Sequence, residues 1–152
     1  MRDWVNEWRQ EGSLWIWRYR NPKHGWDGWH LSADPAGARS LRNLIDRMHG
    51  GQPCHRTLRL EPMTDAVLAV PNYKRPIMPD SDRLRVDYTP EAGALSLAAV
   101  EKRLVLLIGS SSIRPLAAAL AQVEAGYGDF GMAMAKGLGR DRLMFWWSPL
   151  AG

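Results

Sequence analysis

The side chains of this sequence that are suited to chemistry occur in small groups, and none has the spacing of a known catalytic motif. His24, Asp27 and His30 are metal-ligating types, but the six-residue gap between the histidines matches no common zinc spacing. Cys54 and His55 are a nucleophile and a base by type, yet neighbours in a strand point to opposite faces. The sequence therefore predicts no catalytic residue, no metal site and no cofactor.

Two other segments have features of anion-binding sites. Residues 136–142 are glycine-rich and basic, but they lack the longer spacing of a phosphate-binding loop and do not lead from a strand into a helix. Ser110–Ser112 begin an expected helix, where backbone N–H groups can bind an anion, although serine there is also an ordinary cap. We interpret the first segment as a hairpin loop and the second as a helix start.

Tryptophan is the compositional outlier, with eight among 152 residues, arranged as four close pairs. Tryptophan dominates binding hot spots because it supplies a large contact area at low entropic cost. It also packs well in cores, and we assign about five of the eight to core or rim positions. The remainder are candidates for an exposed binding surface.

Basic and aromatic residues alternate around one expected hairpin, and this is the best local candidate for a binding surface. The predicted partner-binding residues are Trp15, Trp17, Arg18, Arg20, Lys23, His24, Trp26 and Trp29. No recognised nucleic-acid-binding motif accompanies them. The other interpretation is a solvated hairpin tip beside core tryptophans.

The composition, with 45% hydrophobic and 24% charged residues, is that of a globular protein. The net charge of +4 lies in residues 1–79, which hold 12 basic and 8 acidic side chains, whereas residues 80–152 hold 8 of each. An anionic partner is therefore expected to meet the first half. One cysteine, no signal-like leader and no run long enough to span a bilayer together predict a cytoplasmic protein without membrane association.

Local patterns predict the elements of the first half. Residues 3–11 have the signals of a short helix, and residues 13–20 alternate as a strand with the odd-numbered aromatics on one side. Residues 26–32 return as a second strand. A helix then runs from Asp34-Pro35 to about Met48, with a buried stripe at positions 41, 44, 45 and 48. Residues 57–61 and 66–70 follow as strands.

The second half is expected to begin with a hairpin of residues 84–88 and 94–98. Residues 103–108 form an apolar run, typical of a strand covered on both faces. A second helix begins at Ser110 and ends near Gly126, and residues 130–135 and 142–147 close the chain as strands. Residues 115–125 are apolar nearly all round, so this helix is either internal or the interface of a homodimer.

Residues 29–48 and 104–123 align without gaps as a strand, a small-residue turn and an amphipathic helix. A recurring unit is typical of a fold built from two similar halves. The sequence therefore predicts a single α+β domain over residues 1–152, with a mostly antiparallel mixed sheet, two main helices and pseudo-repeat halves at about 13–71 and 82–149.

The order of elements around Gly37-Ala-Arg-Ser-Leu41 resembles small α+β immunity proteins of bacterial toxin–immunity pairs. The resemblance covers residues 29–70 and, more faintly, 105–147. It implies a protein that binds and inhibits a toxin without chemistry of its own. The basic charge argues against the nuclease-blocking kind, because such inhibitors tend to be acidic mimics of nucleic acid.

Three hypotheses follow. The first is a cytoplasmic protein-binding module, such as an immunity-type inhibitor of a bacterial toxin, that acts through the Trp-rich basic hairpin. The second is nucleic-acid binding by the basic first half, which would depend strongly on salt. The third is a small enzyme for an anionic substrate, which a concave site with converging His and Arg side chains would favour.

Overall fold

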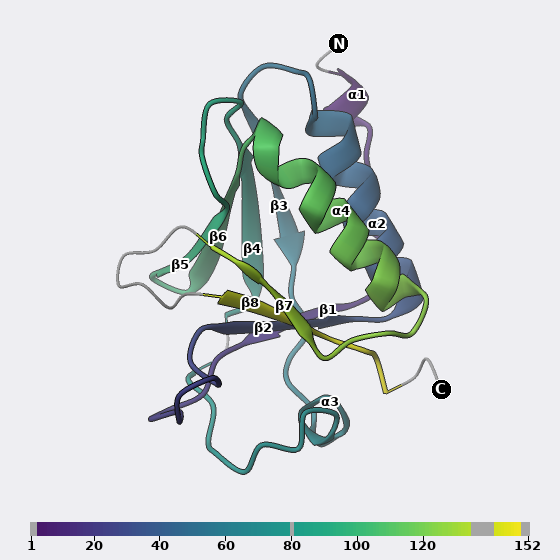
Figure 1. Ribbon diagram of the computed structural model, residues 1–152. Helices are drawn as coiled ribbons and strands as arrows, with labels where there is room; N and C mark the ends of the chain where they lie inside the picture. Colours follow the sequence, from purple (N-terminus) through teal and green to yellow (C-terminus); the bar gives the residue numbers. More distant parts are fainter. Residues whose placement is uncertain (1–2, 80, 135–141, 150–152) are drawn as a thin grey trace.

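The computed structural model describes residues 3–79, 81–134 and 142–149 and has an α+β fold (Figure 1). Four helices and eight strands follow one another along these residues. Their bounds are α1 Asp3–Asn6, β1 Leu14–Trp17, β2 Trp29–Ala33, α2 Pro35–Met48, β3 Cys54–Arg59, α3 Asp65–Ala69, β4 Arg83–Tyr88, β5 Ser96–Val100, β6 Arg103–Ile108, α4 Ser110–Glu124, β7 Phe130–Ala133 and β8 Arg142–Trp146. The predicted fold class is confirmed.

The strands form two four-stranded sheets rather than the one sheet expected. The first sheet has the order β1-β2-β8-β7 and the second has the order β3-β4-β6-β5. Each sheet is mixed: its central pair is parallel, β2 with β8 and β4 with β6, and its outer pairs are antiparallel. The expected hairpin of β4 with β5 does not form, because β6 lies between them.

The two sheets have the same topology. Strands β1, β2, β8 and β7 of the first sheet correspond, in that order, to β5, β6, β4 and β3 of the second. Each pair of neighbouring strands runs in the same relative direction, parallel or antiparallel, as the corresponding pair in the other sheet. Helix α2, shifted by the 75 residues of the sequence alignment, coincides with α4 to within one residue. The repeating unit is thus strand-strand-helix-strand-strand, with β4 as the fourth strand of the first unit, and each sheet combines strands from both units.

Helices α2 and α4 pack against each other and cover one face of the second sheet (Figure 1). The stripe predicted for α2 is confirmed, since Leu41, Leu44, Ile45 and Met48 are all fully buried. In α4 the buried residues include Ile113, Leu116, Leu120 and Val123, whereas Pro115, Ala118 and Gln122 are exposed. The α4 helix therefore buries one face in its own chain and presents the other, which includes Arg114 and Gln122, to solvent.

The start of α2 follows the predicted chemistry. Asp34 is the N-cap, and its Oδ1 accepts hydrogen bonds from Gly37 N at 2.7 Å and from Ser13 N at 3.0 Å. One carboxylate oxygen thus satisfies a free N–H group of the helix and also holds the beginning of β1. Gly37 must lack a side chain, because a Cβ there would overlap the backbone of Ser13.

Two local predictions are wrong. Helix α3 (Asp65–Ala69) occupies the place of the strand expected over residues 66–70: Thr64 caps it by accepting a hydrogen bond from Val67 N at 3.2 Å, and Val67 is its one fully buried residue. A short apolar run does not distinguish a strand from a helix, and here the cap decides. The helix expected over residues 3–11 extends only from Asp3 to Asn6, because Trp8 instead anchors the segment by donating its indole N–H to Ser40 O at 2.9 Å.

Candidate functional site

The aromatic residues of the predicted binding hairpin are mostly packed inside the protein. The odd-numbered residues of β1 lie on the face of the first sheet that is turned away from α2 and α4, as the alternation predicted. There they meet α3 and the chain that follows it (Figure 1). We call this group the aromatic cluster; its members are Trp15, Trp17, Tyr19, Trp26, His30, Tyr73 and Trp146.

His30 lies at the centre of the aromatic cluster and is fully buried. Its Nδ1 accepts a hydrogen bond from the Trp146 indole N–H at 3.0 Å, so its Nε2 carries the proton and donates to Trp26 O at 3.2 Å. Burial lowers the pKa of His30 to about 4, and the carbonyl of Trp26 and the charge of Asp27 offset only part of that shift. His30 is therefore a neutral structural residue with both ring nitrogens in use, and it is not available as a metal ligand.

Trp26 is half-buried and stacks between two other rings. Its indole lies parallel to Tyr73, with centroids 4.2 Å apart, and to Trp146, with centroids 5.7 Å apart. Nearby, the Trp15 and Trp17 indole N–H groups and the Tyr19 hydroxyl are buried without a hydrogen-bond partner among the described residues. Burial raises the pKa of Tyr19, which the Trp17 indole partly opposes. This face of the first sheet thus has a packed aromatic interior.

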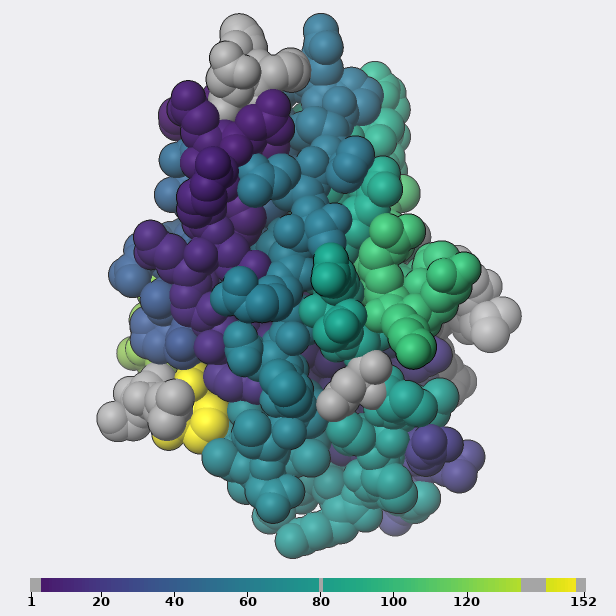
Figure 2. Space-filling model, turned by 180° about the vertical axis from the view of Figure 1, so that it is seen from behind, coloured from purple at the N-terminus to yellow at the C-terminus, as the bar shows by residue number. Residues whose placement is uncertain are grey.

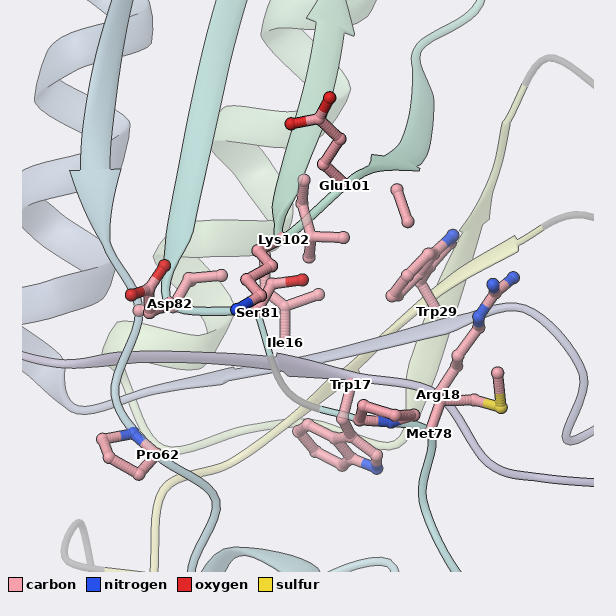
Figure 3. A pocket seen from close by; sticks show the side chains of 14 residues that line it. Ile16, Trp17, Arg18, Trp29, Pro62, Met78, Ser81, Asp82, Glu101 and Lys102 are labelled. Carbon is pink, nitrogen blue, oxygen red and sulfur yellow. The ribbon is translucent and has the colours of Figure 1, made fainter.

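A groove with a volume of about 540 Å³ lies between the two sheets (Figure 3). Its apolar floor combines Ile16 and Trp29 of the first sheet with Leu104 of the second, together with Leu60 and Met78. Four charged side chains lie around it. Arg18, Asp82, Glu101 and Lys102 form this rim.

Arg18 and Trp29 form one side of the groove. The guanidinium carbon of Arg18 lies 4.6 Å from the centroid of the Trp29 ring, a cation–π contact. Trp29 is 9% exposed and Arg18 is exposed, so the pair combines a buried ring with an accessible charge. Figure 3 shows Asp82 and Ser81 on the other side of the groove.

The predicted binding residues are therefore divided between two places. Trp17, Arg18 and Trp29 line the groove, whereas Trp15 and Trp26 belong to the aromatic cluster alone. The other three lie in the exposed connection at the far end of the hairpin: Arg20 donates to Ile77 O at 3.2 Å, Lys23 N donates to the Tyr73 hydroxyl, and His24 is exposed. None of these three residues, Arg20, Lys23 and His24, lines the groove.

Sequence reasoning missed most of the groove, because its residues come from segments far apart in the chain. Met78, Asp82, Glu101 and Lys102 are separated from Trp17 by 60 residues or more. Glu101 has a φ of 58° in the tight β5–β6 turn, which places Lys102 beside the groove, but Glu-Lys is not a pair of residue types that predicts such a turn. The tryptophan count was more informative, since five of the eight are buried as expected: Trp8, Trp15, Trp17, Trp29 and Trp146.

The remaining candidates from the sequence have structural explanations or no described geometry. Ser112 Oγ accepts from Gly109 N at 3.0 Å, and Ser110 Oγ lies 3.0 Å from the Tyr88 hydroxyl, so both serines serve the start of α4. Most of residues 136–142 lie outside the described residues. Among the residues that are described, no group of three or more His, Cys, Asp or Glu side chains could hold a metal ion.

No helix in the described part of the chain is long and apolar enough to cross a membrane. In comparisons with known proteins, no family model, no curated protein and no solved structure matches this chain. Its function must therefore be argued from the groove and the surfaces around it.

Proposed function

We propose that this protein is a protein-binding module that takes an apolar side chain of its partner into the groove between the two sheets. The observation that carries the proposal is the Arg18–Trp29 pair at an open apolar groove. Tryptophan and arginine are, with tyrosine, the residues enriched at the energetic centres of protein interfaces. Here they lie together at a concave site, and Arg18 remains accessible.

The charges of the groove support a polypeptide as the occupant. Arg18 and Lys102 supply positive charge, and Asp82 and Glu101 supply negative charge, around one apolar floor. A rim of both signs can orient a peptide segment whose charged side chains flank an apolar one, because mismatched charges are repelled. A polyanion such as nucleic acid would meet two carboxylates at this site.

The resemblance to immunity proteins suggests the class of partner. On this proposal the chain inhibits a bacterial toxin by occupying its surface. The surface used is the groove and its rim, rather than the whole hairpin that the sequence singled out. No histidine of the described residues lines the groove, so the arrangement of converging His and Arg that would favour the enzyme hypothesis is not found there.

The test is capture of partners from native cells by the tagged protein, compared with two variants of the groove. Ala99→Trp fills the groove from β5, and Arg18→Glu reverses the charge beside Trp29. We expect the unmodified chain to retain one stoichiometric protein at high ionic strength. Both variants should lose it by about tenfold or more, which corresponds to about 1.4 kcal/mol.

Matched controls separate the groove from general effects of substitution. Ala118→Trp and Arg114→Glu make the same changes at exposed positions of α4, away from the groove, and should retain the partner. Circular dichroism and the thermal midpoint confirm that all four variants fold. Retention of the partner by both groove variants, or recovery of nucleic acid that is lost at high ionic strength, would refute the proposal.

A further inference from the structure

Strand β6 has an apolar residue at every position from Leu104 to Ile108, a pattern typical of a strand covered on both faces. Within the described residues, only one face of this strand is fully covered. Leu104, Leu106 and Ile108 are buried in the main core, whereas Val105 and Leu107 lie on the opposite side of the second sheet and are only half-buried. We call this opposite side the open face of the second sheet; Figure 2 is turned toward it.

The open face has an unusual concentration of arginine. The strand register places Arg59, Arg83 and Arg103 next to one another on β3, β4 and β6, and Arg85 lies two residues along β4 on the same face. Like charges at neighbouring positions of a sheet repel one another. Arg85 is paired with Asp87 at 2.6 Å and Arg59 is 3.9 Å from Glu61, but Arg83 and Arg103 have no ion pair among the described residues.

The other half of the same face is aliphatic. Val105 and Leu107 on β6 lie beside Ala98 and Ser96 on β5, and Val100 at the end of β5 is 45% exposed. Arginines thus lie mainly toward β3 and β4, and aliphatic side chains toward β5 and β6. A face divided in this way is complementary to a partner element with an acidic side and an aliphatic side.

The chain itself shows what covers such a face. The 75-residue offset places Val105 and Leu107 at the positions of His30 and Ser32 in the first sheet, which are fully or almost fully buried. The cover there includes helix α3 through Val67, from the long connection between β3 and β4. The equivalent connection between β7 and β8 has only residues 134–141. Helix α3 thus covers one of the two equivalent faces, and no helix of the described residues covers the other.

We propose that the open face of the second sheet binds an amphipathic helix of a partner protein, with carboxylates on one flank and aliphatic residues on the other. Helix neighbours three or four residues apart are about 5–6 Å apart, close to the spacing of about 4.8 Å between strands. A second copy of this chain would bring the arginine half of the face against arginines or against aliphatic side chains, and neither neutralises Arg83 and Arg103. Nucleic acid would leave the aliphatic half of the face uncovered. The proposal is independent of the groove.

The test uses a labelled synthetic peptide of about 14 residues, long enough to span the strands, with glutamates on one flank and leucines on the other. Its binding is measured by fluorescence anisotropy, and its helicity by circular dichroism. The comparison ligands are a scrambled peptide of the same composition and a single-stranded oligonucleotide. The protein variants are Arg83→Glu/Arg103→Glu and Val100→Asp, all at exposed positions, with Arg114→Glu on α4 as the charge control.

We expect the designed peptide to bind, to gain helicity and to lose affinity by about tenfold or more in both face variants, with Arg114→Glu unchanged. The proposal is overturned if the scrambled peptide binds equally well, if the oligonucleotide binds more tightly with the same arginine dependence, or if no ligand binds. It is also overturned if sedimentation shows self-association that Val100→Asp abolishes. None of these outcomes involves the groove, so the proposed function is tested separately.

Discussion

The Trp146 indole donates its N–H to Nδ1 of His30 at 3.0 Å, and this contact fixes the protonation state of the buried ring. With Nδ1 as an acceptor, the ring stays neutral and its Nε2 proton is directed to the carbonyl of Trp26. A second proton would disrupt the hydrogen bond from Trp146 and place a charge among aromatic rings. Burial of the ring, which penalises the charged form, is what lowers the pKa of His30 to about 4.

The first prediction concerns the pH dependence of stability. The pKa of His30 is about 4 in the folded protein and about 6.5 when the chain is unfolded, so the unfolded state binds more protons between these values. The contribution of neutral His30 to the free energy of unfolding should therefore be complete above about pH 6.5 and should be lost as the pH is lowered toward 4. We expect a loss of about 2 kcal/mol from His30 between pH 7 and pH 5, measured by urea denaturation.

Variants assign this loss to one residue. His30→Gln should lower stability at pH 7 and remove most of its dependence on pH in this range, whereas His55→Gln, at an exposed position of β3, should retain the dependence. An NMR titration that finds His30 with an ordinary pKa near 6.5 would contradict this account of the aromatic cluster.

The second prediction concerns the cap of α2. Asp34→Ala removes the acceptor of Gly37 N and Ser13 N together, so it should cost about 1–2 kcal/mol of the free energy of unfolding. Asp34→Asn keeps an acceptor oxygen and should cost much less. Asp46→Ala, on the exposed side of the same helix, is the control. Equal losses for Asp34→Ala and Asp46→Ala would show that the cap is not important.

The third prediction concerns the close approach of α2 to the beginning of β1. Because a Cβ on Gly37 would overlap Ser13 O, Gly37→Ala should destabilise the protein by about 1–3 kcal/mol, despite the higher helix propensity of alanine. Gly93→Ala is the matched control, since a Cβ there meets no atom within 4 Å. Thermal denaturation measures both, and a more stable Gly37→Ala variant would contradict the described contact.

The fourth prediction concerns α4, whose apolar sequence left burial and dimerisation as alternatives. Leu120 is fully buried, so Leu120→Ala should cost about 2–5 kcal/mol. Ala118 lies on the exposed face, and we expect Ala118→Glu to leave stability and the sedimentation coefficient unchanged. A change in oligomeric state on this substitution would instead support a homodimer formed through residues 115–125.

The sequence was most informative where the deciding interactions are local. The boundaries of α2 followed from the Asp34 cap, Pro35 and the spacing of its buried residues, and the apolar run of β6 was placed correctly. The alternation in β1 also predicted which side chains share a face. These features depend on residues a few positions apart, where periodicity and capping act directly.

Pairing between distant strands could not be predicted in the same way. The insertion of β6 between β4 and β5 depends on a parallel pairing that no turn residue indicates. The groove depends on the same arrangement, because it forms only when Trp29 of β2 and Lys102 of the β5–β6 turn come together. The packing of the hairpin's aromatic residues into an interior could not be predicted either, because α3, which covers them, was misread as a strand.

The most direct test of the central claim is a two-dimensional NMR spectrum of the tryptophan indole N–H groups, recorded before and after addition of the captured partner. Trp29 borders the groove, so its resonance reports on contact with the partner there. Trp8 is buried elsewhere with its indole N–H bonded to Ser40 O, so its resonance reports on any general change in the structure. The account predicts that the Trp29 resonance shifts on binding while that of Trp8 stays in place. A partner that binds while the Trp29 resonance does not move would contradict it.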